Sequence, residues 1–271
     1  MNLQEATAHL FRRALLLWVL LFTFFSWTGF EAANILSQSP QWLPPGPLKH
    51  ITHALPQLPD TWQAILLLVL PWVIIVLAAV ELWRPTRWWI AALIWWLYVN
   101  VMNTGWLSGS GGQQLMANVL FWSIFLPLHR NDGEPRVMAV ASFWIIRLQL
   151  LLAYAATGLH KLTGAHWLDG TAMGIVATDQ AFGPAWLASW PGLSGIITWS
   201  VLLFQLSFPI AVWFRKLRLP WMLFGVAFHL GTTIWMDIPE MGLAFVVCYV
   251  NWLDDHQVKR RPWLTHNATK S

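Results

Sequence analysis

The side chains best suited to chemistry gather around one lysine in the middle of the chain. Lys161 ends an apolar run, lies between His160 and His166, and is followed by Trp167 and Asp169. A lysine that is partly withdrawn from water gives up its proton more readily, so it can act as a general base. Lysines near the end of a membrane helix also extend toward the interface for purely structural reasons. The residues alone leave both interpretations open.

Two further polar residues precede Lys161 at steps of seven, Tyr154 and Arg147. Seven residues make nearly two helical turns, so all three are expected on one face of a helix, with Gly158 on the same stripe. Gln149 points to another side. A buried arginine costs at least about 2.5 kcal/mol inside a membrane, so Arg147 requires a partner. It is expected either to clamp neighbouring helices or to hold an anionic or carbonyl-bearing ligand.

A histidine occupies the middle of a later apolar run, His229 in "GVAFHLGTT". An ionisable group at such a place indicates a functional site, or else a neutral imidazole bonded to a backbone or hydroxyl group. The other histidines do not form a metal-binding pattern, because the spacings of His160 with His166 and of His50 with His53 fit no zinc motif. No metal is expected. The single cysteine, Cys248, permits no internal disulfide and is expected to be a packed apolar side chain.

The composition places these residues in a membrane. Of 271 residues, 57% are hydrophobic and only 10% are charged, whereas a soluble domain carries about 25% charged residues. We therefore predict an all-α, polytopic helical bundle in a cell membrane. A bacterial inner membrane is the expected location. The pI of 9.6 does not indicate nucleic-acid binding, because the basic residues form short clusters between apolar runs. The lipid bilayer is the expected surrounding.

The apolar runs predict eight transmembrane segments, since a spanning helix needs about 20 mostly apolar residues. Their approximate ranges are 15–30, 62–83, 88–106, 115–128, 137–159, 193–214, 221–235 and 239–253. The chain is expected to form one membrane domain over 1–271. A proline-rich outer loop (31–60), an outer or interfacial segment (160–195) and a cytoplasmic tail (254–271) connect and end the helices.

Charge predicts the orientation, because cytoplasmic loops concentrate lysine and arginine. With both termini in the cytoplasm, the inner segments hold all 16 basic residues except Lys49, Lys161 and Arg147. Lys49 and Lys161 then lie outside, and Arg147 lies within a membrane helix. Lys161 therefore stands on the side where lysine is disfavoured, which strengthens the case for a functional role.

The stretch "RLQLLLAYAATGLHKLTGAHWLDGTAM" resembles the signature of the horizontally transferred transmembrane (HTTM) domain, the membrane part shared with vitamin K-dependent gamma-carboxylases. A second block, beginning "FQLSFPIAVWF", resembles the later family pattern. The matching residues are Arg147, Gln149, Tyr154, Gly158, Lys161, Leu162, Trp167 and Gly170, then Pro209, Arg215 and His229. Gln205 departs from the family, because many members have an acidic residue at its position.

This resemblance implies a site on the non-cytoplasmic side that uses a quinone-type cofactor. In the carboxylases, the lysine at the position of Lys161 is the proposed base for vitamin K hydroquinone. Applied to this chain, the resemblance implies that Lys161, His229 and Tyr154 are the catalytic residues. Arg147, Gln149 and Trp167 become the cofactor-binding residues. Glutamate carboxylation itself is not expected, because the carboxylases hold their peptide substrate with a large C-terminal region.

Three functions follow, in order of preference. The first is a carboxylase-like membrane enzyme with a lysine base. The second is a non-catalytic membrane partner in the maturation or export of a secreted peptide or small protein, since small members resemble a membrane subunit with such a role. The third is a small-solute transporter, although no pair of broken helices in matching halves supports it.

Overall fold

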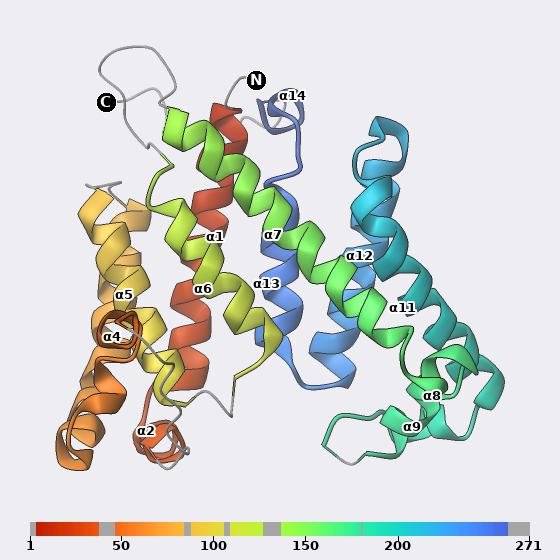
Figure 1. Ribbon diagram of the computed structural model, residues 1–271, viewed down its shortest axis with the longest axis horizontal. Coiled ribbons are helices and arrows are strands. Elements are labelled where there is room, and N and C mark those ends of the chain that lie inside the picture. The colour runs from red at the N-terminus through yellow and green to blue at the C-terminus, as the bar shows by residue number, and fades with distance from the viewer. Residues whose placement is uncertain are drawn as a thin grey trace. The chain divides into compact units, whose positions relative to one another are not determined.

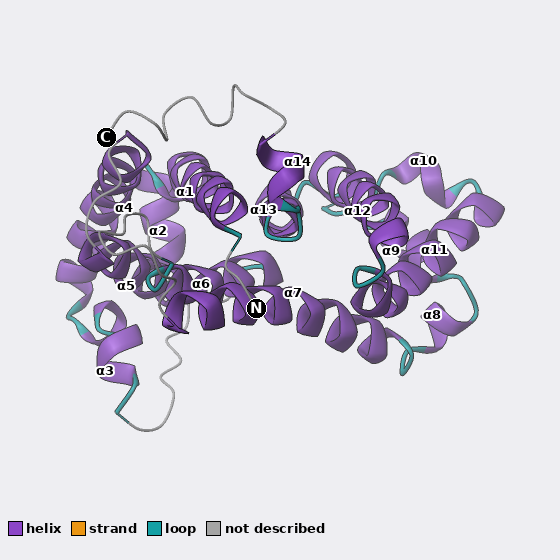
Figure 2. Ribbon diagram, turned by 90° about the horizontal axis from the view of Figure 1, so that it is seen from above, coloured by secondary structure: helices purple, strands orange, loops and turns teal. Residues whose placement is uncertain are grey.

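The structure, a computed structural model, describes residues 4–37, 47–83, 88–105, 109–126, 137–179 and 181–259. These residues form helices and connecting turns with no β-strand among them (Figures 1 and 2). The predicted all-α class is therefore confirmed. The basic residues at 84, 87, 130, 136, 260, 261 and 270, on which the orientation rests in large part, lie outside the described residues.

Each of the eight predicted segments coincides with a helix. The four that are long and apolar enough to cross a membrane are α1 (Glu5–Trp27), α4 (Asp60–Trp83), α7 (Val137–Lys161) and α11 (Pro191–Ala211). The other four are α5 (Trp88–Thr104), α6 (Gly111–Ser123), α12 (Arg215–Trp235) and α13 (Pro239–Val250). The structure thus supports a multi-pass membrane protein. The count of eight spans and the cytoplasmic termini stay predictions.

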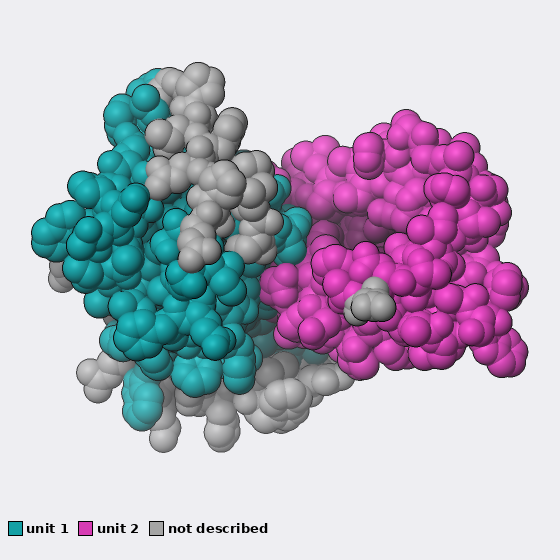
Figure 3. All heavy atoms as spheres, turned by 90° about the horizontal axis from the view of Figure 1, so that it is seen from below, with its two compact units in different colours: residues 1–146, 253–271 teal, residues 147–252 magenta. Residues whose placement is uncertain are grey.

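The chain divides into two compact units (Figure 3). Unit 1 comprises residues 1–146 and 253–271, and unit 2 comprises residues 147–252. The first boundary falls inside α7, and the second follows the end of α13. The functional residues predicted from the sequence, from Arg147 to His229, all belong to unit 2.

In unit 1, α1 starts ten residues before the predicted segment, so Arg12 lies within the helix and not in front of it. The Arg12 guanidinium is buried and forms an ion pair with the buried carboxylate of Glu81, near the end of α4. The first turn of α1 is also held by α14 (Asp255–Lys259), because Asp255 Oδ1 accepts a bond of 3.0 Å from the Thr7 N–H. These partners explain why the helix extends beyond its apolar run.

The region predicted as an outer loop, 31–60, contains short helices in its described part. These are α2 (Phe30–Ser37), α3 (Lys49–Thr52) and a 3₁₀ turn, η1 (Leu55–Gln57). Asn100 of α5 holds this region through both ends of its amide. Its Nδ2 donates to the Ile51 carbonyl at 3.0 Å, and its Oδ1 accepts from the Leu55 N–H at 3.1 Å. Of the "LPPGPL" stretch at 43–48, residues 43–46 lie outside the described residues.

In unit 2, the predicted outer segment 160–195 folds into three short helices, α8 (Ala165–Leu168), α9 (Ala172–Thr178) and α10 (Ala185–Ala188). The Met173 N–H at the start of α9 donates to Thr198 Oγ1 of α11 at 3.0 Å. Gly174 lies against Ser194 of the same helix, where a Cβ would stand only 3.1 Å from its hydroxyl oxygen. This segment is therefore packed on the start of α11.

Candidate functional site

The face of α7 predicted to carry Arg147, Tyr154 and Lys161 is buried at the first two positions. Arg147 is 6% exposed and Tyr154 is 1% exposed, whereas Lys161 is partly exposed at the helix end. Tyr154 and Lys161 are separated by about 10 Å along the helix axis, given a rise of 1.5 Å per residue. The face therefore divides into a buried part and an interfacial part.

Arg147 is engaged by the end of α13. Its Nε donates to the Asn251 carbonyl at 2.9 Å, and its guanidinium lies over the Trp252 ring, 5.0 Å from the ring centroid. These contacts match the predicted helix clamp. Cofactor binding by Arg147 stays a prediction, as does that of Gln149, which is half-buried on another side of α7.

Tyr154 lies at the centre of a buried hydrogen-bonded chain. Its hydroxyl is 2.6 Å from Nε2 of His229 on α12 and is also hydrogen-bonded to the hydroxyl of Tyr249 on α13. Three helices thus contribute one polar side chain each to a single row of atoms. The structure brings Tyr154 and His229 together, and it adds Tyr249.

Aromatic rings surround these three hydrogen-bonded side chains. The His229 ring stacks on Phe245, with centroids 4.6 Å apart and planes 13° from parallel. Tyr154 packs against Phe208 of α11 at 4.6 Å. Gly225 allows this approach, because a Cβ there would come within 2.7 Å of Cζ of the Tyr249 ring. The environment is apolar, so the hydrogen bonds of the chain are strong and costly to break.

The interfacial part of the face pairs Lys161 with an aromatic ring. Lys161 Nζ lies 4.7 Å from the ring centroid of Trp167, which follows in α8. Such a cation–π contact orients the amine and lowers its contact with water. Lys161 and Trp167 are therefore adjacent, whereas Tyr154, which bonds His229 of α12, lies two turns earlier in α7.

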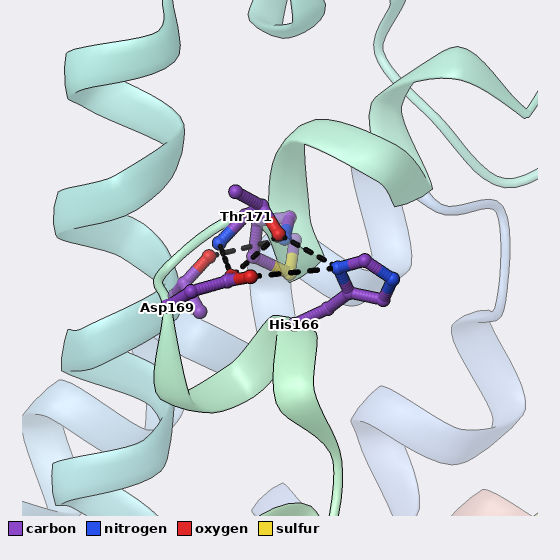
Figure 4. Close-up of polar contacts among 5 residues, drawn as sticks. His166, Asp169 and Thr171 are labelled. Carbon is purple, nitrogen blue, oxygen red and sulfur yellow. Dashed lines mark hydrogen bonds and ion pairs between the residues drawn. The ribbon is translucent and has the colours of Figure 1, made fainter.

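His166 and Asp169 form a small exposed cluster with Thr171 beside α8 (Figure 4). Asp169 Oδ1 accepts from the Thr171 hydroxyl at 2.6 Å and from its backbone N–H at 2.9 Å. These two bonds, in that order, lower the pKa of Asp169 below its usual value, and nearby His166 adds to the effect. Gly170 completes the turn with a φ of +82°, which favours glycine.

Replacing Thr171 with valine is expected to raise the pKa of Asp169 toward the ordinary value of about 3.9. The hydroxyl bond stabilises the carboxylate, so the native turn is fully formed above that value and loosens as pH falls through the lowered native pKa. The measurement is a ¹³C NMR titration of labelled aspartate. Thr163→Val is the control, because the Thr163 hydroxyl donates to the His160 carbonyl instead. An unchanged Asp169 pKa in the Thr171 variant would contradict this account.

Gly158 and Gln205 mark the closest approach of α7 and α11. A Cβ on Gly158 would lie 3.0 Å from Leu206 Cδ2 and 3.3 Å from the Gln205 carbonyl carbon. The expectation that Gly158 permits a close neighbour is thus met by a helix. Gln205 is buried, and no hydrogen bond to its Oε1 is present in the described part of the chain.

Comparison with known proteins identifies a family whose match contains the site residues described above. Residues 114–252 match the HTTM domain family, which is more than half of the chain. This chain belongs to the HTTM domain family. The chain is also 24% identical over 194 residues to the sporulation-delaying protein SdpB of Bacillus subtilis (strain 168). That match covers 63% of this chain and 58% of SdpB. No solved structure matches the chain.

The HTTM match contains the whole of unit 2 and begins near the start of α6. It therefore includes every residue that the sequence singled out for catalysis or cofactor binding. Helices α1 to α5 precede it. The buried Tyr249–Tyr154–His229 row and the Lys161–Trp167 pair both lie inside the HTTM region.

Tyr249 is the site residue that sequence reasoning missed. It follows Cys248 in an apolar run with no charged neighbour, where a tyrosine resembles any other packed aromatic residue. One signal was available, because the chain has only three tyrosines and two of them, Tyr154 and Tyr249, lie within the HTTM region. A phenol deep in a membrane segment needs a hydrogen-bond partner.

Proposed function

We propose that this HTTM protein is a membrane enzyme that carries out base-catalysed chemistry at the outer membrane interface on a lipid-soluble, quinone-type cofactor. Lys161 is the base. The observation that carries the proposal is the position of Lys161 on the helix that also carries Tyr154, the hydrogen-bond partner of the buried His229. One helix thereby connects a proton-accepting amine at the interface with hydrogen-bonding groups in the apolar interior.

The residues present suit such a cofactor. Aromatic rings line the buried chain, and the hydrogen-bonding groups are uncharged phenols and an imidazole, which match a flat molecule with oxygen substituents. A reduced quinone supplies a weakly acidic hydroxyl and a route to reaction with oxygen. The protein's part is to orient Lys161 against Trp167, to exclude water and to accept the proton at Nζ.

The hollowed surface of unit 2 adds support. Viewed from the side on which α8 and α9 lie, the face of unit 2 shows a recess (Figure 3). Lys161 ends α7 directly before α8. The recess therefore lies on the same side of unit 2 as the helices that follow Lys161.

The test is analysis of the lipids that co-purify with the protein. Extraction of the purified protein with organic solvent, followed by mass spectrometry, is expected to yield a quinone in near-equimolar amount. An unrelated multi-pass protein from the same membranes is the control for quinone carried by bulk lipid. Equal, substoichiometric quinone in both samples would contradict the proposal.

A second candidate is a non-catalytic partner in the maturation of a secreted peptide. The similarity to a sporulation-delaying protein favours it. Two stretches are then separate candidates for the docking surface, residues 38–58 and the packed segment 160–195. A small protein that co-purifies in gentle detergent and is lost on deletion of 38–58, but not of 262–271, would support this role. Its absence from the intact protein would count against it.

A further inference from the structure

The buried row of polar atoms in unit 2 has an inherent direction. Tyr249, Tyr154 and His229 are 2%, 1% and 2% exposed, so water does not compete for their hydrogen bonds. The row runs from the Tyr249 hydroxyl to the Tyr154 hydroxyl and on to His229 Nε2. The central hydroxyl has one proton, and these are its two hydrogen-bond partners among the described residues, so its proton is used only if both bonds point the same way along the row.

Acidity decides that direction. A phenol, with an ordinary pKa near 10, is a far better donor than a neutral imidazole N–H, and an imidazole nitrogen is a better acceptor than a phenol oxygen. Tyr154 therefore donates to His229 Nε2, and Tyr249 donates to Tyr154. The bond at one ring nitrogen sets the tautomer, so neutral His229 carries its proton on Nδ1.

His229 Nδ1 is then a buried donor, and it has no hydrogen-bond partner in the described part of the structure. The ring cannot turn easily to find one, because it is stacked on Phe245 and also contacts Phe228, whose centroid is 4.7 Å away. A buried donor without an acceptor is costly and rare in native proteins. The Nδ1–H of His229 is therefore a fixed donor that can bond an acceptor supplied by a ligand.

We propose that His229 Nδ1–H is the hydrogen-bond donor of a binding site for an uncharged, lipid-soluble molecule that presents a carbonyl oxygen. Tyr249 is a positioning residue, because it acts through Tyr154 to keep the proton on Nδ1. The ligand is uncharged because the surrounding rings are apolar and a charge would be costly there. This inference rests on the proposed function and assigns a specific atom of that site.

Two substitutions of His229 distinguish the contributions of its two ring nitrogens to ligand binding. The amide nitrogen of His229→Asn lies near the place of Nδ1, whereas that of His229→Gln lies near the place of Nε2. In nanodiscs, quenching of tryptophan fluorescence by decylubiquinone measures binding. His229→Asn is expected to keep the affinity within about threefold. His229→Gln is expected to lose at least about tenfold, or about 1.4 kcal/mol.

Equal loss in both variants, or no loss in the glutamine variant, would overturn the proposal. Dioleoylglycerol, added as a competitor, distinguishes a quinone carbonyl from the ester carbonyl of a lipid. Displacement of decylubiquinone by dioleoylglycerol at comparable concentration assigns the site to lipid esters, which also provide the carbonyl. A wild-type protein that binds neither probe contradicts the inference.

A second measurement does not depend on any variant at His229 folding correctly. Solid-state ¹⁵N NMR of histidine-labelled protein reports which ring nitrogen is protonated, and wild-type His229 is expected to be the Nδ1–H tautomer. Tyr154→Phe should abolish this preference and Tyr249→Phe should weaken it, whereas the neighbouring Cys248→Ala should leave it unchanged. An Nε2–H tautomer in the wild type would refute the proposal.

The outcomes also separate this inference from the proposed function. If purified protein contains a quinone whose binding is insensitive to His229, the inference fails and the proposed function stands. If His229 binds a carbonyl compound but Lys161 variants retain full activity, the inference stands and the base role of Lys161 fails.

Discussion

Replacement of Lys161 by alanine is expected to lower quinol-dependent oxygen uptake by at least about a hundredfold, because positioned general bases typically contribute about 10² to 10⁴ in rate. The amine ends α7 and lies 4.7 Å from the Trp167 ring centroid, and no other lysine occurs in the segment 160–195. The assay uses reconstituted proteoliposomes, reduced decylubiquinone and an oxygen electrode.

Lys161→Arg distinguishes a base from a structural charge. Arginine keeps the positive charge and the contact with Trp167, but its guanidinium is not deprotonated in proteins. The arginine variant is therefore expected to be as inactive as the alanine variant while remaining folded. Thr163→Ala, on the exposed turn after Lys161, is the control for local disturbance. Full activity of Lys161→Arg would show that Lys161 serves only to anchor the helix end.

The sequence predicted the helices well because membrane helices follow from the length of apolar runs. Each of the eight predicted runs is helical, including α7 with both ends within two residues. It predicted the first helix less well. α1 starts at Glu5 because Glu81 and Asp255, distant in sequence, bind its first turns. Tertiary partners of this kind leave no local pattern.

The candidate site was predictable only in part, because some of its features follow from local periodicity and others from tertiary packing. Arg147 and Tyr154 could be placed on one face because helical periodicity is local. The family resemblance put His229 and Tyr154 in one site, but neither it nor their spacing predicted the hydrogen bond between them. Tyr249 was missed, because its role depends on how α13 packs against α7 and α12. Gly225 and Gly242 allow that packing, and their effect is visible only once the helices are placed.

Replacement of Glu81 by leucine is expected to destabilise unit 1 by about 3–5 kcal/mol, which is the usual cost of leaving one member of a buried ion pair alone. The Glu81 side chain is fully buried and that of Arg12 is 6% exposed, so solvent cannot take over the lost interaction. Thermal unfolding in detergent, followed by circular dichroism, measures the loss. Glu31→Leu, at an exposed carboxylate on α2, is expected to change stability by less than about 0.5 kcal/mol.

The double variant Arg12→Met and Glu81→Leu tests whether the loss of stability comes from the unpaired charge of Arg12. Replacing a whole buried ion pair by apolar side chains of similar volume is often neutral or stabilising, because the desolvation cost of both charges is removed. The double variant should therefore recover most of the stability that Glu81→Leu loses. If it is as unstable as the single variant, the loss comes from packing between α1 and α4 and not from an unpaired charge. Recovery would show that Arg12, which the sequence placed among the orienting charges before the first helix, acts mainly through its buried partner.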